Sequence, residues 1–310
     1  MEFRQFRYIL KTAEEGSISL AAQKLYISQP SLSQLIASVE KKIGASLFDR
    51  SNTPLRPTLV GQLYLDAARR ILNIDHEFRQ QVDDVLNLKT GHIIVGSSPF
   101  RSTYLLAPFL PVFQQKYPLI ELTLVENTTR NLEQLVLRGE VDFAISLLPI
   151  DRKEFDHVEI FSEELLLALP PKHPLVGEKG LEPGNFERLP EISLAELKDT
   201  PFILIHKEQK MHDALMSLCK KAGFTPRIQT ETRSMEAAQA MAGAGFCATL
   251  LPHTLIHGNH PPLPPCYAAL DTHPTRQVIV AWRQNRYLSR ASRQFIEDLR
   301  DFCANSYPAR

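Results

Sequence analysis

The chain has 310 residues, enough for about two or three domains, and its 44% hydrophobic and 23% charged residues are typical of a folded protein. Its 35 basic and 35 acidic residues cancel, which excludes a basic coat over the whole molecule but not a local basic patch. The four cysteines lie far apart in the sequence, so we expect reduced thiols and a cytoplasmic location. No signal-like or membrane-spanning apolar run is visible.

The amino-terminal part shows three short helical patterns followed by two brief extended pieces. Apolar residues at spacings of three and four predict a first helix over residues 3–13, which Gly16 can end in the left-handed conformation. Ser17 and Ser28 can cap the second and third helices with their side-chain oxygens. Short helices joined by a tight turn predict a helix-turn-helix, and extended pieces on either side of residues 51–54 predict a hairpin wing.

The third helix exposes hydroxyl and amide side chains, which suit the base edges of a DNA major groove. Residues 1–61 hold eight Lys or Arg residues against five acidic ones, so a local positive excess lies in a neutral chain. We therefore predict a DNA-binding domain over residues 1–61. Each of these side chains, taken singly, is also compatible with an ordinary solvated helix surface.

Three motifs in this domain carry a family resemblance. They are residues 16–22, 25–33 and 44–50, which read GSISLAA, LYISQPSLS and GASLFDR, followed by Thr58 and Gly61. Their order and spacing resemble the amino-terminal domain of LysR-type transcriptional regulators. The resemblance implies a winged helix-turn-helix that reads DNA with the helix starting near Ser28, while the wing contacts phosphates. The residues assigned to DNA on this basis are Ser28, Gln29, Pro30, Ser31, Ser33, Gln34, Arg50 and Arg56.

One position departs from the family pattern. Many members have arginine where this chain has Gln34. A glutamine can pair with adenine but cannot offer the guanidinium fork to guanine. The preferred operator bases therefore stay open.

Residues 62–87 carry one long amphipathic pattern, which predicts a linker helix. Its apolar side chains recur at heptad-like spacings over about three heptads. They are Tyr64, Ala68, Ile71, Ile74, Phe78, Val82 and Val85. Such a seam predicts pairing with a second copy of the chain, with packing on its own effector domain as the alternative. The family resemblance implies the same homodimer, usually doubled to a homotetramer, on double-stranded operator DNA.

From residue 91 onward, predicted strands alternate with helices, which indicates an α/β fold with a parallel sheet and right-handed crossovers. We expect an effector-binding domain over residues 91–310. Its first lobe would comprise about residues 91–164 and 270–310, and its second lobe about residues 165–269. Two such lobes with a double crossover resemble periplasmic solute-binding domains, which is the family's effector fold.

A small-molecule site is expected between the lobes, beyond the carboxyl ends of strands. The predicted contacts are Ser98, Arg101, Thr128, Thr129, Ile205, His206 and Phe246. Free N–H groups at the strand-to-helix turns favour an anion, and Arg101 with several hydroxyls predicts a small anionic metabolite. Helix capping alone would also explain the hydroxyls of Ser98, Thr128 and Thr129, and His206 also fits an ordinary surface or core histidine.

Two other motifs are discounted. Residues 243–248 fit a dinucleotide fingerprint, but they follow a helix and precede a strand, which is the wrong context. His253, His257 and His260 are metal-ligand types, but the proline-rich residues 261–265 favour a surface loop. We therefore predict neither a metal site nor a cofactor.

The sequence thus predicts a ligand-responsive transcriptional regulator, with a contact to RNA polymerase, no membrane association and no enzymatic activity. Two alternatives belong to other classes. One is a ligand-converting enzyme that carries an appended DNA-binding domain, and the other is a solute-binding protein.

Overall fold

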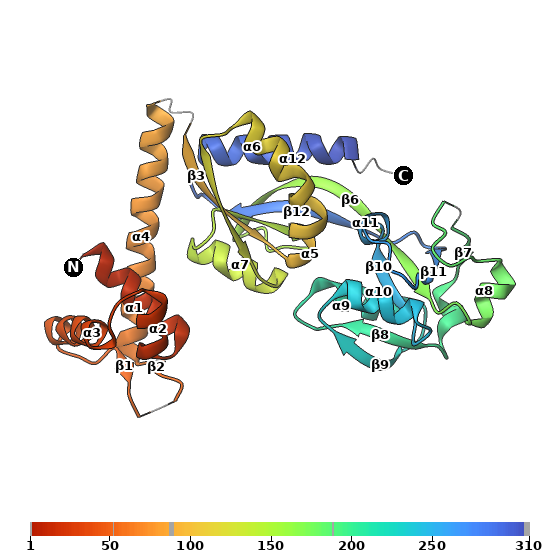
Figure 1. Ribbon diagram of the computed structural model, residues 1–310, viewed down its shortest axis with the longest axis horizontal. Coiled ribbons are helices and arrows are strands. Elements are labelled where there is room, and N and C mark those ends of the chain that lie inside the picture. The colour runs from red at the N-terminus through yellow and green to blue at the C-terminus, as the bar shows by residue number, and fades with distance from the viewer. Residues whose placement is uncertain (1, 52, 87–89, 188, 307–310) are drawn as a thin grey trace. The chain divides into compact units, whose positions relative to one another are not determined.

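The computed structural model of the protein describes residues 2–51, 53–86, 90–187 and 189–306, and Figure 1 shows its ribbon. The chain divides into two compact units close to Leu88. Each unit has apolar clusters of its own, and each is described by itself below.

The first unit begins with the three predicted helices, and the predicted caps are confirmed. Gly16 ends the first helix with a φ of 57°, a left-handed conformation that glycine adopts without a Cβ clash. The Ser17 hydroxyl accepts a hydrogen bond from the Leu20 amide, and the Ser28 hydroxyl accepts one from the Ser31 amide. The helices are α1 (Phe3–Glu15), α2 (Ile18–Lys24) and α3 (Gln29–Ile43).

The predicted wing is also present. Strands β1 (Phe48–Asp49) and β2 (Arg56–Pro57) pair antiparallel. The segment that links the two strands includes Asn52, which lies outside the described residues.

Ala21 and Ala22 of α2 are buried between the helices of the first unit, because their small side chains allow a close crossing.

The long helix α4 (Leu59–Val85) corrects the predicted seam at its amino-terminal end. Tyr64 and Ala68 are buried in the core of the first unit, because α1 packs against this part of α4. The ring of Tyr64 lies 5.9 Å from that of Phe6. Further along, Phe78 has 62% of its surface exposed. The other large apolar residues that α4 exposes are Leu59, Leu63, Ile71, Ile74 and Val85, and Val82 is half-buried.

The second unit is built on an eight-stranded sheet that is mixed, which corrects the predicted parallel one. Strands β3 (Gly91–Ser97), β4 (Ile120–Glu126) and β5 (Phe143–Leu147) are parallel to one another, as predicted. Strand β12 (Thr275–Arg283), however, lies antiparallel to both β5 and β6 (Phe155–Leu169). Because β12 returns from the second lobe, it enters the sheet from the opposite end.

Strand β6 is long enough to serve both lobes (Figure 1). Its first part pairs with β12, and its last part pairs antiparallel with β10 (Thr249–Pro252) and β11 (Cys266–Leu270). A short strand β7 (Glu191–Ile192) adds to β11. Strands β8 (Pro201–Ile205) and β9 (Arg227–Thr232) form a separate parallel pair in the second lobe.

The helical segment that follows β3 is divided into α5 (Pro99–Arg101), a π-helical turn (Ser102–Leu106) and α6 (Ala107–Lys116). The loop expected around His253 is instead the helix α11 (His253–Gly258), because Leu255 and Ile256 are buried in the second lobe. The remaining helices are α7 (Thr129–Arg138), α8 (Pro174–Lys179), a 3₁₀ turn (Leu194–Leu197), α9 (Lys210–Lys221), α10 (Met235–Gly243) and α12 (Arg290–Ser306).

Each lobe has apolar clusters of its own. In the first lobe, Phe109, Phe113 and Phe295 stack edge to face or tilted, with ring centroids 4.9 to 5.7 Å apart. In the second lobe the clusters are dominated by aliphatic residues of β6, β8 and β10. None of the helices in the described ranges is both long and apolar enough to cross a membrane.

Candidate DNA interface and effector cavity

The amino-terminal end of α3 presents a polar surface that is already organised. Gln29, Ser31 and Gln34 are exposed, and Ser33 is half-buried. The Gln29 side-chain amide donates a hydrogen bond to the Ser33 hydroxyl over 2.9 Å, and the hydroxyls of Ser28 and Ser31 are 2.7 Å apart. Pro30 lies in the first turn, where it leaves no helical hydrogen bond unmade. The predicted base-reading residues are therefore brought together on one short surface.

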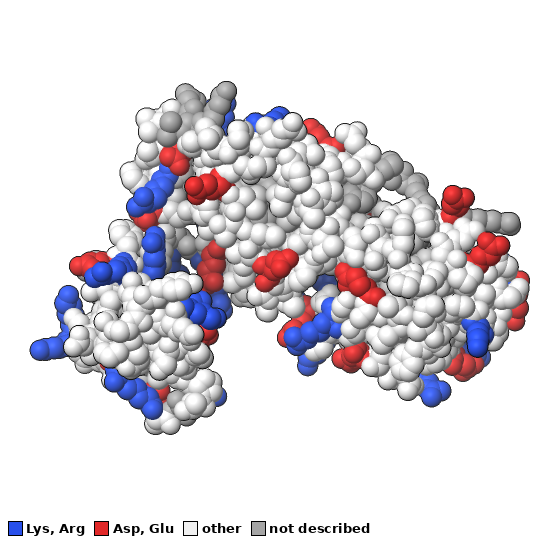
Figure 2. Space-filling view, in the orientation of Figure 1, with Lys and Arg blue, Asp and Glu red and all other residues white. Residues whose placement is uncertain are grey.

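The two wing arginines differ in their surroundings. Arg50 forms an ion pair with Glu40 over 3.3 Å, and the same carboxylate accepts a hydrogen bond from the Leu47 amide. Arg56 is exposed and forms no ion pair with any described residue. Figure 2 shows Lys and Arg side chains at several places on the visible face of this domain. Arg56 is therefore free to contact a phosphate, whereas Arg50 would have to exchange Glu40 for one.

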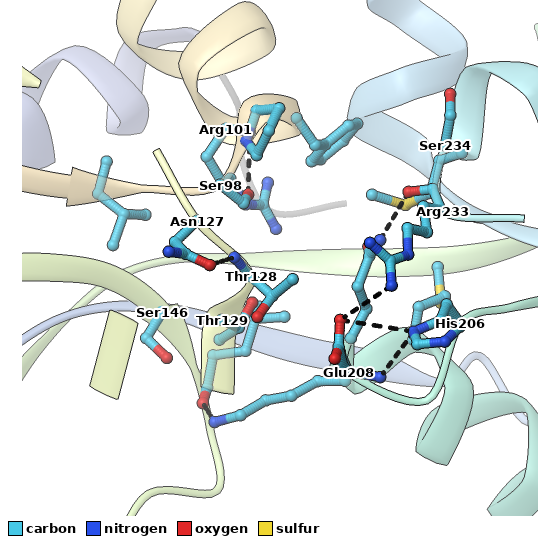
Figure 3. Close-up of a pocket in the computed structure, with 18 of the residues that line it drawn as sticks. Ser98, Arg101, Asn127, Thr128, Thr129, Ser146, His206, Glu208, Arg233 and Ser234 are labelled. Carbon is cyan, nitrogen blue, oxygen red and sulfur yellow. Dashed lines mark hydrogen bonds and ion pairs between the residues drawn. The ribbon is translucent and has the colours of Figure 1, made fainter. Parts of the chain in front are cut away.

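A cavity of about 410 Å³ lies between the two lobes of the second unit. On the first-lobe side it is lined by residues that follow β3 and β4 and by the last residues of β5 (Figure 3). Ser98 caps α5, and Asn127 accepts a hydrogen bond from the Thr128 amide over 2.9 Å. The Thr128 hydroxyl is buried and has no hydrogen-bond partner among the described residues. Ser98, Thr128 and Thr129 are thus brought together as predicted, and one of them keeps an unused polar atom.

The second-lobe side is lined by the ends of β8 and β9 (Figure 3). His206 lines the cavity as predicted, and its Nδ1 lies 3.6 Å from a carboxylate oxygen of Glu208. Arg233 lies 3.7 Å from the same carboxylate, and Ser234 caps α10. Arg233 and Glu208 on this side are therefore paired with each other, whereas Lys210, which also lines the cavity, forms an ion pair with Glu133 of the first lobe over 2.8 Å.

Two predicted contacts lie away from the cavity. Ile205 is buried in the second-lobe core, because alternate side chains of a strand point to opposite faces. Phe246 follows the carboxyl-terminal end of α10, whereas the cavity lies at the amino-terminal end of that helix. Ile205 and Phe246 are therefore removed from the candidate site.

Arg101 lines the cavity, but its charge is engaged within the protein. Its guanidinium pairs with both carboxylate oxygens of Glu163, which is fully buried on β6. Arg276 on β12 pairs with the same carboxylate, and the Thr254 hydroxyl donates to it over 2.9 Å. Arg276 also lines the cavity. The buried guanidinium group of Arg101 and the largely buried one of Arg276 therefore share a single carboxylate.

The pKa values of this cluster follow from that arrangement. Burial alone would raise the pKa of Glu163, but the charges of Arg101 and Arg276 and the hydrogen bonds from Arg101 and Thr254 lower it to about 2. Burial, and secondly the neighbouring charge of Arg101, lower the pKa of Arg276 against the attraction of Glu163. The cluster thus carries two cations and one anion, and its excess positive charge lies beside the cavity.

The sequence analysis missed several of the cavity residues. Arg276 gave no signal, because its position beside Glu163 depends on the antiparallel pairing of β12 with β6. The others follow strands or lie at their ends, so the same rule that selected Ser98 and Thr128 was available for them. They are Asn127, Ser146, Glu208, Arg233 and Ser234.

All four cysteines are buried, and burial raises the pKa of each thiol, to about 11 for Cys219 and about 12 for Cys303. Within the described ranges, no group of three or more His, Cys, Asp or Glu side chains is arranged to hold a metal ion.

Two family models match the chain. The bacterial regulatory helix-turn-helix of the lysR family matches residues 3–62, and the LysR substrate-binding domain matches residues 87–304.

Relatives match along nearly the whole chain. The uncharacterised HTH-type transcriptional regulator YwbI of Bacillus subtilis is 30% identical over 302 residues, which cover 97% of each chain. A probable RuBisCO transcriptional regulator of Synechocystis sp. is 31% identical over 299 residues, which cover 95% of this chain and 84% of the relative.

Solved structures share the fold. Full-length OxyR C199D from Pseudomonas aeruginosa has a TM-score of 0.70 at 25% identity, covering 98% of this chain and 95% of that one. Full-length CbnR complexed with its target DNA has a TM-score of 0.69 at 23% identity, covering 97% of this chain and 99% of that one. These relatives are named as regulators, not as enzymes or solute-binding proteins. The chain belongs to the LysR family of transcriptional regulators, with a helix-turn-helix DNA-binding domain and an effector-binding domain.

Proposed function

We propose that this regulator responds to a small anionic metabolite, which binds in the cavity between the lobes. The observation that carries the proposal is the buried cluster in which Arg101 and Arg276 share Glu163 beside the cavity. An excess buried cation is unfavourable by itself, and an anion in the cavity would neutralise it at short range. The volume of about 410 Å³ suits a small molecule.

The other polar groups of the cavity would orient such an anion. The Thr128 hydroxyl is free to donate a hydrogen bond, and α7 and α10 direct their amino-terminal ends towards the cavity from opposite lobes. Arg101 then acts chiefly by holding Glu163, and Arg276 shares its charge with the ligand. This arrangement would bind a metabolite through charge and hydrogen bonds from both lobes.

For DNA, we propose that α3 enters the major groove and the wing follows the backbone. Gln29, Pro30, Ser31, Ser33 and Gln34 would meet base edges or nearby phosphates, and Ser28 would fix the start of the helix. Arg50 and Arg56 would contact phosphates, so that affinity falls steeply with salt. The exposed polar surface at the start of α3 supports this assignment.

We further propose that the regulator works in the cytoplasm as a homodimer or homotetramer paired along α4, with a contact to RNA polymerase. The working division of the chain stays that of a DNA-binding domain over residues 1–61, a linker over 62–87 and an effector domain over 91–310. The exposed apolar stripe of α4 supports the pairing, because such a stripe is unfavourable in water.

Calorimetric titration of the full chain with small carboxylates and phosphates, beside their uncharged amide or alcohol analogues, tests the effector class. We expect an anion to bind at least about tenfold more tightly than its neutral analogue, since hydrogen bonds to charged groups contribute about 1.5–3 kcal/mol. Arg276→Gln should lose that preference and keep its fold, because Glu163 stays paired with Arg101 and Thr254.

Arg233→Gln is the matched control, since Arg233 also lines the cavity but is largely exposed and paired with Glu208. It should change the affinity less than about threefold. Equal binding of anions and neutral analogues, or wild-type affinity in Arg276→Gln, would contradict an anionic effector.

A further inference from the structure

The turn between α2 and α3 has an unusual residue, a tyrosine, at the position that requires a left-handed backbone conformation. Tyr26 adopts a φ of 56°, in the left-handed region. Its amide donates to the Gln23 carbonyl over 3.2 Å, and the Ile27 amide donates to the Ala22 carbonyl over 3.1 Å. This hydrogen-bond pattern is a Schellman motif, in which the left-handed residue is usually glycine and sometimes asparagine. A bulky tyrosine there is a conformational outlier.

Two other helix ends in this domain have glycine at the corresponding left-handed position. Gly16 ends α1 with a φ of 57°, and Gly44 ends α3 with a φ of 79°. The backbone at Tyr26 makes the same demand on its residue, so the geometry of the turn does not explain the tyrosine.

Packing does not explain the tyrosine either. Tyr26 has 95% of its surface exposed, the highest value among the large apolar residues that the described chain exposes. Its side chain is therefore almost entirely in solvent, and little of it is buried to offset the backbone strain. A residue whose backbone is strained and whose side chain is not stabilised by packing is expected at a functional surface.

The position of this residue points to DNA. Tyr26 precedes by two residues Ser28, which begins α3. When a recognition helix enters a major groove with its amino-terminal end, the turn before it lies at the edge of the groove, beside the sugar-phosphate backbone. Tyrosine hydroxyls are common donors to phosphate oxygens.

We propose that Tyr26 is a DNA-backbone contact, whose hydroxyl donates a hydrogen bond to a phosphate at the edge of the groove and whose ring lies on the adjoining deoxyribose. This inference rests on the proposed entry of α3 into the major groove. The contact is uncharged, so it positions the domain without adding a cation and is independent of base sequence.

The test uses the full chain and a duplex selected from a random library by the wild-type protein. Tyr26→Asn is the decisive variant, because asparagine tolerates the left-handed conformation that strains tyrosine. We expect its melting temperature to equal or exceed that of the wild type, while its affinity for the selected duplex falls about three- to tenfold, the loss of a contact of ordinary strength. Tyr26→Phe should lose part of this affinity, because it keeps the ring.

Salt dependence separates this contact from a cationic one. Tyr26→Asn should leave the slope of log Kd against log salt concentration unchanged, because tyrosine releases no counterion. Arg56→Gln is the matched control in the wing, and it should reduce the slope by about one.

Wild-type affinity in Tyr26→Asn would overturn the proposal, and would leave Tyr26 as a surface for another protein. A weaker affinity accompanied by a lower melting temperature would also overturn it, because Tyr26 would then act through the turn. Gln29→Ala and Ser33→Ala separate the Tyr26 contact from the proposed entry of α3 into the groove. If these two variants weaken binding and Tyr26→Asn does not, only the Tyr26 contact is wrong. If none of the three variants weakens binding, the entry of α3 into the groove is wrong as well.

Discussion

At the scale of single residues, the cluster of Arg101, Glu163 and Arg276 depends on one shared carboxylate. Removing charges from water is unfavourable, and attraction between close partners offsets that cost only while the geometry holds. Glu163 is the common partner, and Thr254 from α11 of the second lobe adds a further hydrogen bond to it. The cluster therefore connects α5 in the first lobe, the two crossing strands and α11 in the second lobe through one carboxylate.

Glu163→Gln should consequently destabilise the effector domain strongly. We expect its free energy of unfolding to fall by about 3–5 kcal/mol near neutral pH, because two buried guanidinium groups lose their counter-ion. Urea unfolding followed by circular dichroism measures the difference. Glu159→Gln is the matched control, since Glu159 lies exposed on the same strand, and it should change stability by less than about 0.5 kcal/mol.

The difference in free energy of unfolding between the wild type and Glu163→Gln should depend on pH in a definite direction. The folded state lowers the pKa of Glu163 from 4.5 to about 2, so its stabilising contribution is present above pH 4.5 and is lost as the pH falls towards 2. The gap between wild type and Glu163→Gln should therefore narrow in acid. A gap that stays constant down to about pH 3 would show that the charge of Glu163 is not what stabilises the domain.

The sequence allowed part of this site to be predicted. Ser98 and Thr128 follow strands, so a general rule about strand ends found them without coordinates. Arg276 and Glu163 are 113 residues apart and meet only through strand pairing, which no local pattern reports. The role given to Arg101 changed for the same reason, since its partner is remote in sequence.

At the scale of elements, α4 does two things along one helix. Its amino-terminal part completes the core of the DNA-binding domain through Tyr64 and Ala68, while Ile74 and Phe78 stay exposed further along. Periodicity located the helix and its apolar residues correctly. It could not say which neighbour each apolar residue meets, because spacing defines a face of a helix and not its partner.

Phe78→Asp should therefore break a dimer that pairs along α4. Burying a phenylalanine contributes about 1.5–3 kcal/mol, and a symmetric interface contains it twice, so we expect dimerisation to weaken at least about a hundredfold. Sedimentation velocity over a concentration series measures this change.

Gln62→Asp adds the same charge to the same helix on the side away from the stripe, near the amino-terminal end, where an acidic residue is tolerated. It should leave the dimer intact. If Phe78→Asp dimerises as strongly as the wild type, the dimer interface does not lie on the apolar stripe of α4.

The sheet of the second unit shows a similar limit of prediction. The strands were found because runs of branched apolar residues mark buried strands, and β3, β4 and β5 are parallel as their connecting helices require. The antiparallel direction of β12 could not be predicted, because its chain first passes through the whole second lobe.

At the scale of the whole molecule, the two lobes share the crossing strands β6 and β12, and the charged cluster joins those strands to α5 beside the cavity. A ligand changes the balance of lobe arrangements only by its difference in affinity between them. An anion that contacts Arg276 and Thr128 on one side and the ends of β8 and β9 on the other would favour the arrangement in which the two lobes lie close together around it. A ligand-dependent change in the arrangement of the lobes would allow a regulator to couple metabolite binding to DNA binding.

The most direct test is hydroxyl-radical footprinting of the wild-type protein on the selected duplex, with and without an anion shown to bind by calorimetry. The account predicts two protected half-sites about one helical turn or a multiple of it apart, and a protection pattern that changes when the anion is bound. A single protected site from a monomeric protein, or the same footprint with and without the bound anion, would contradict it.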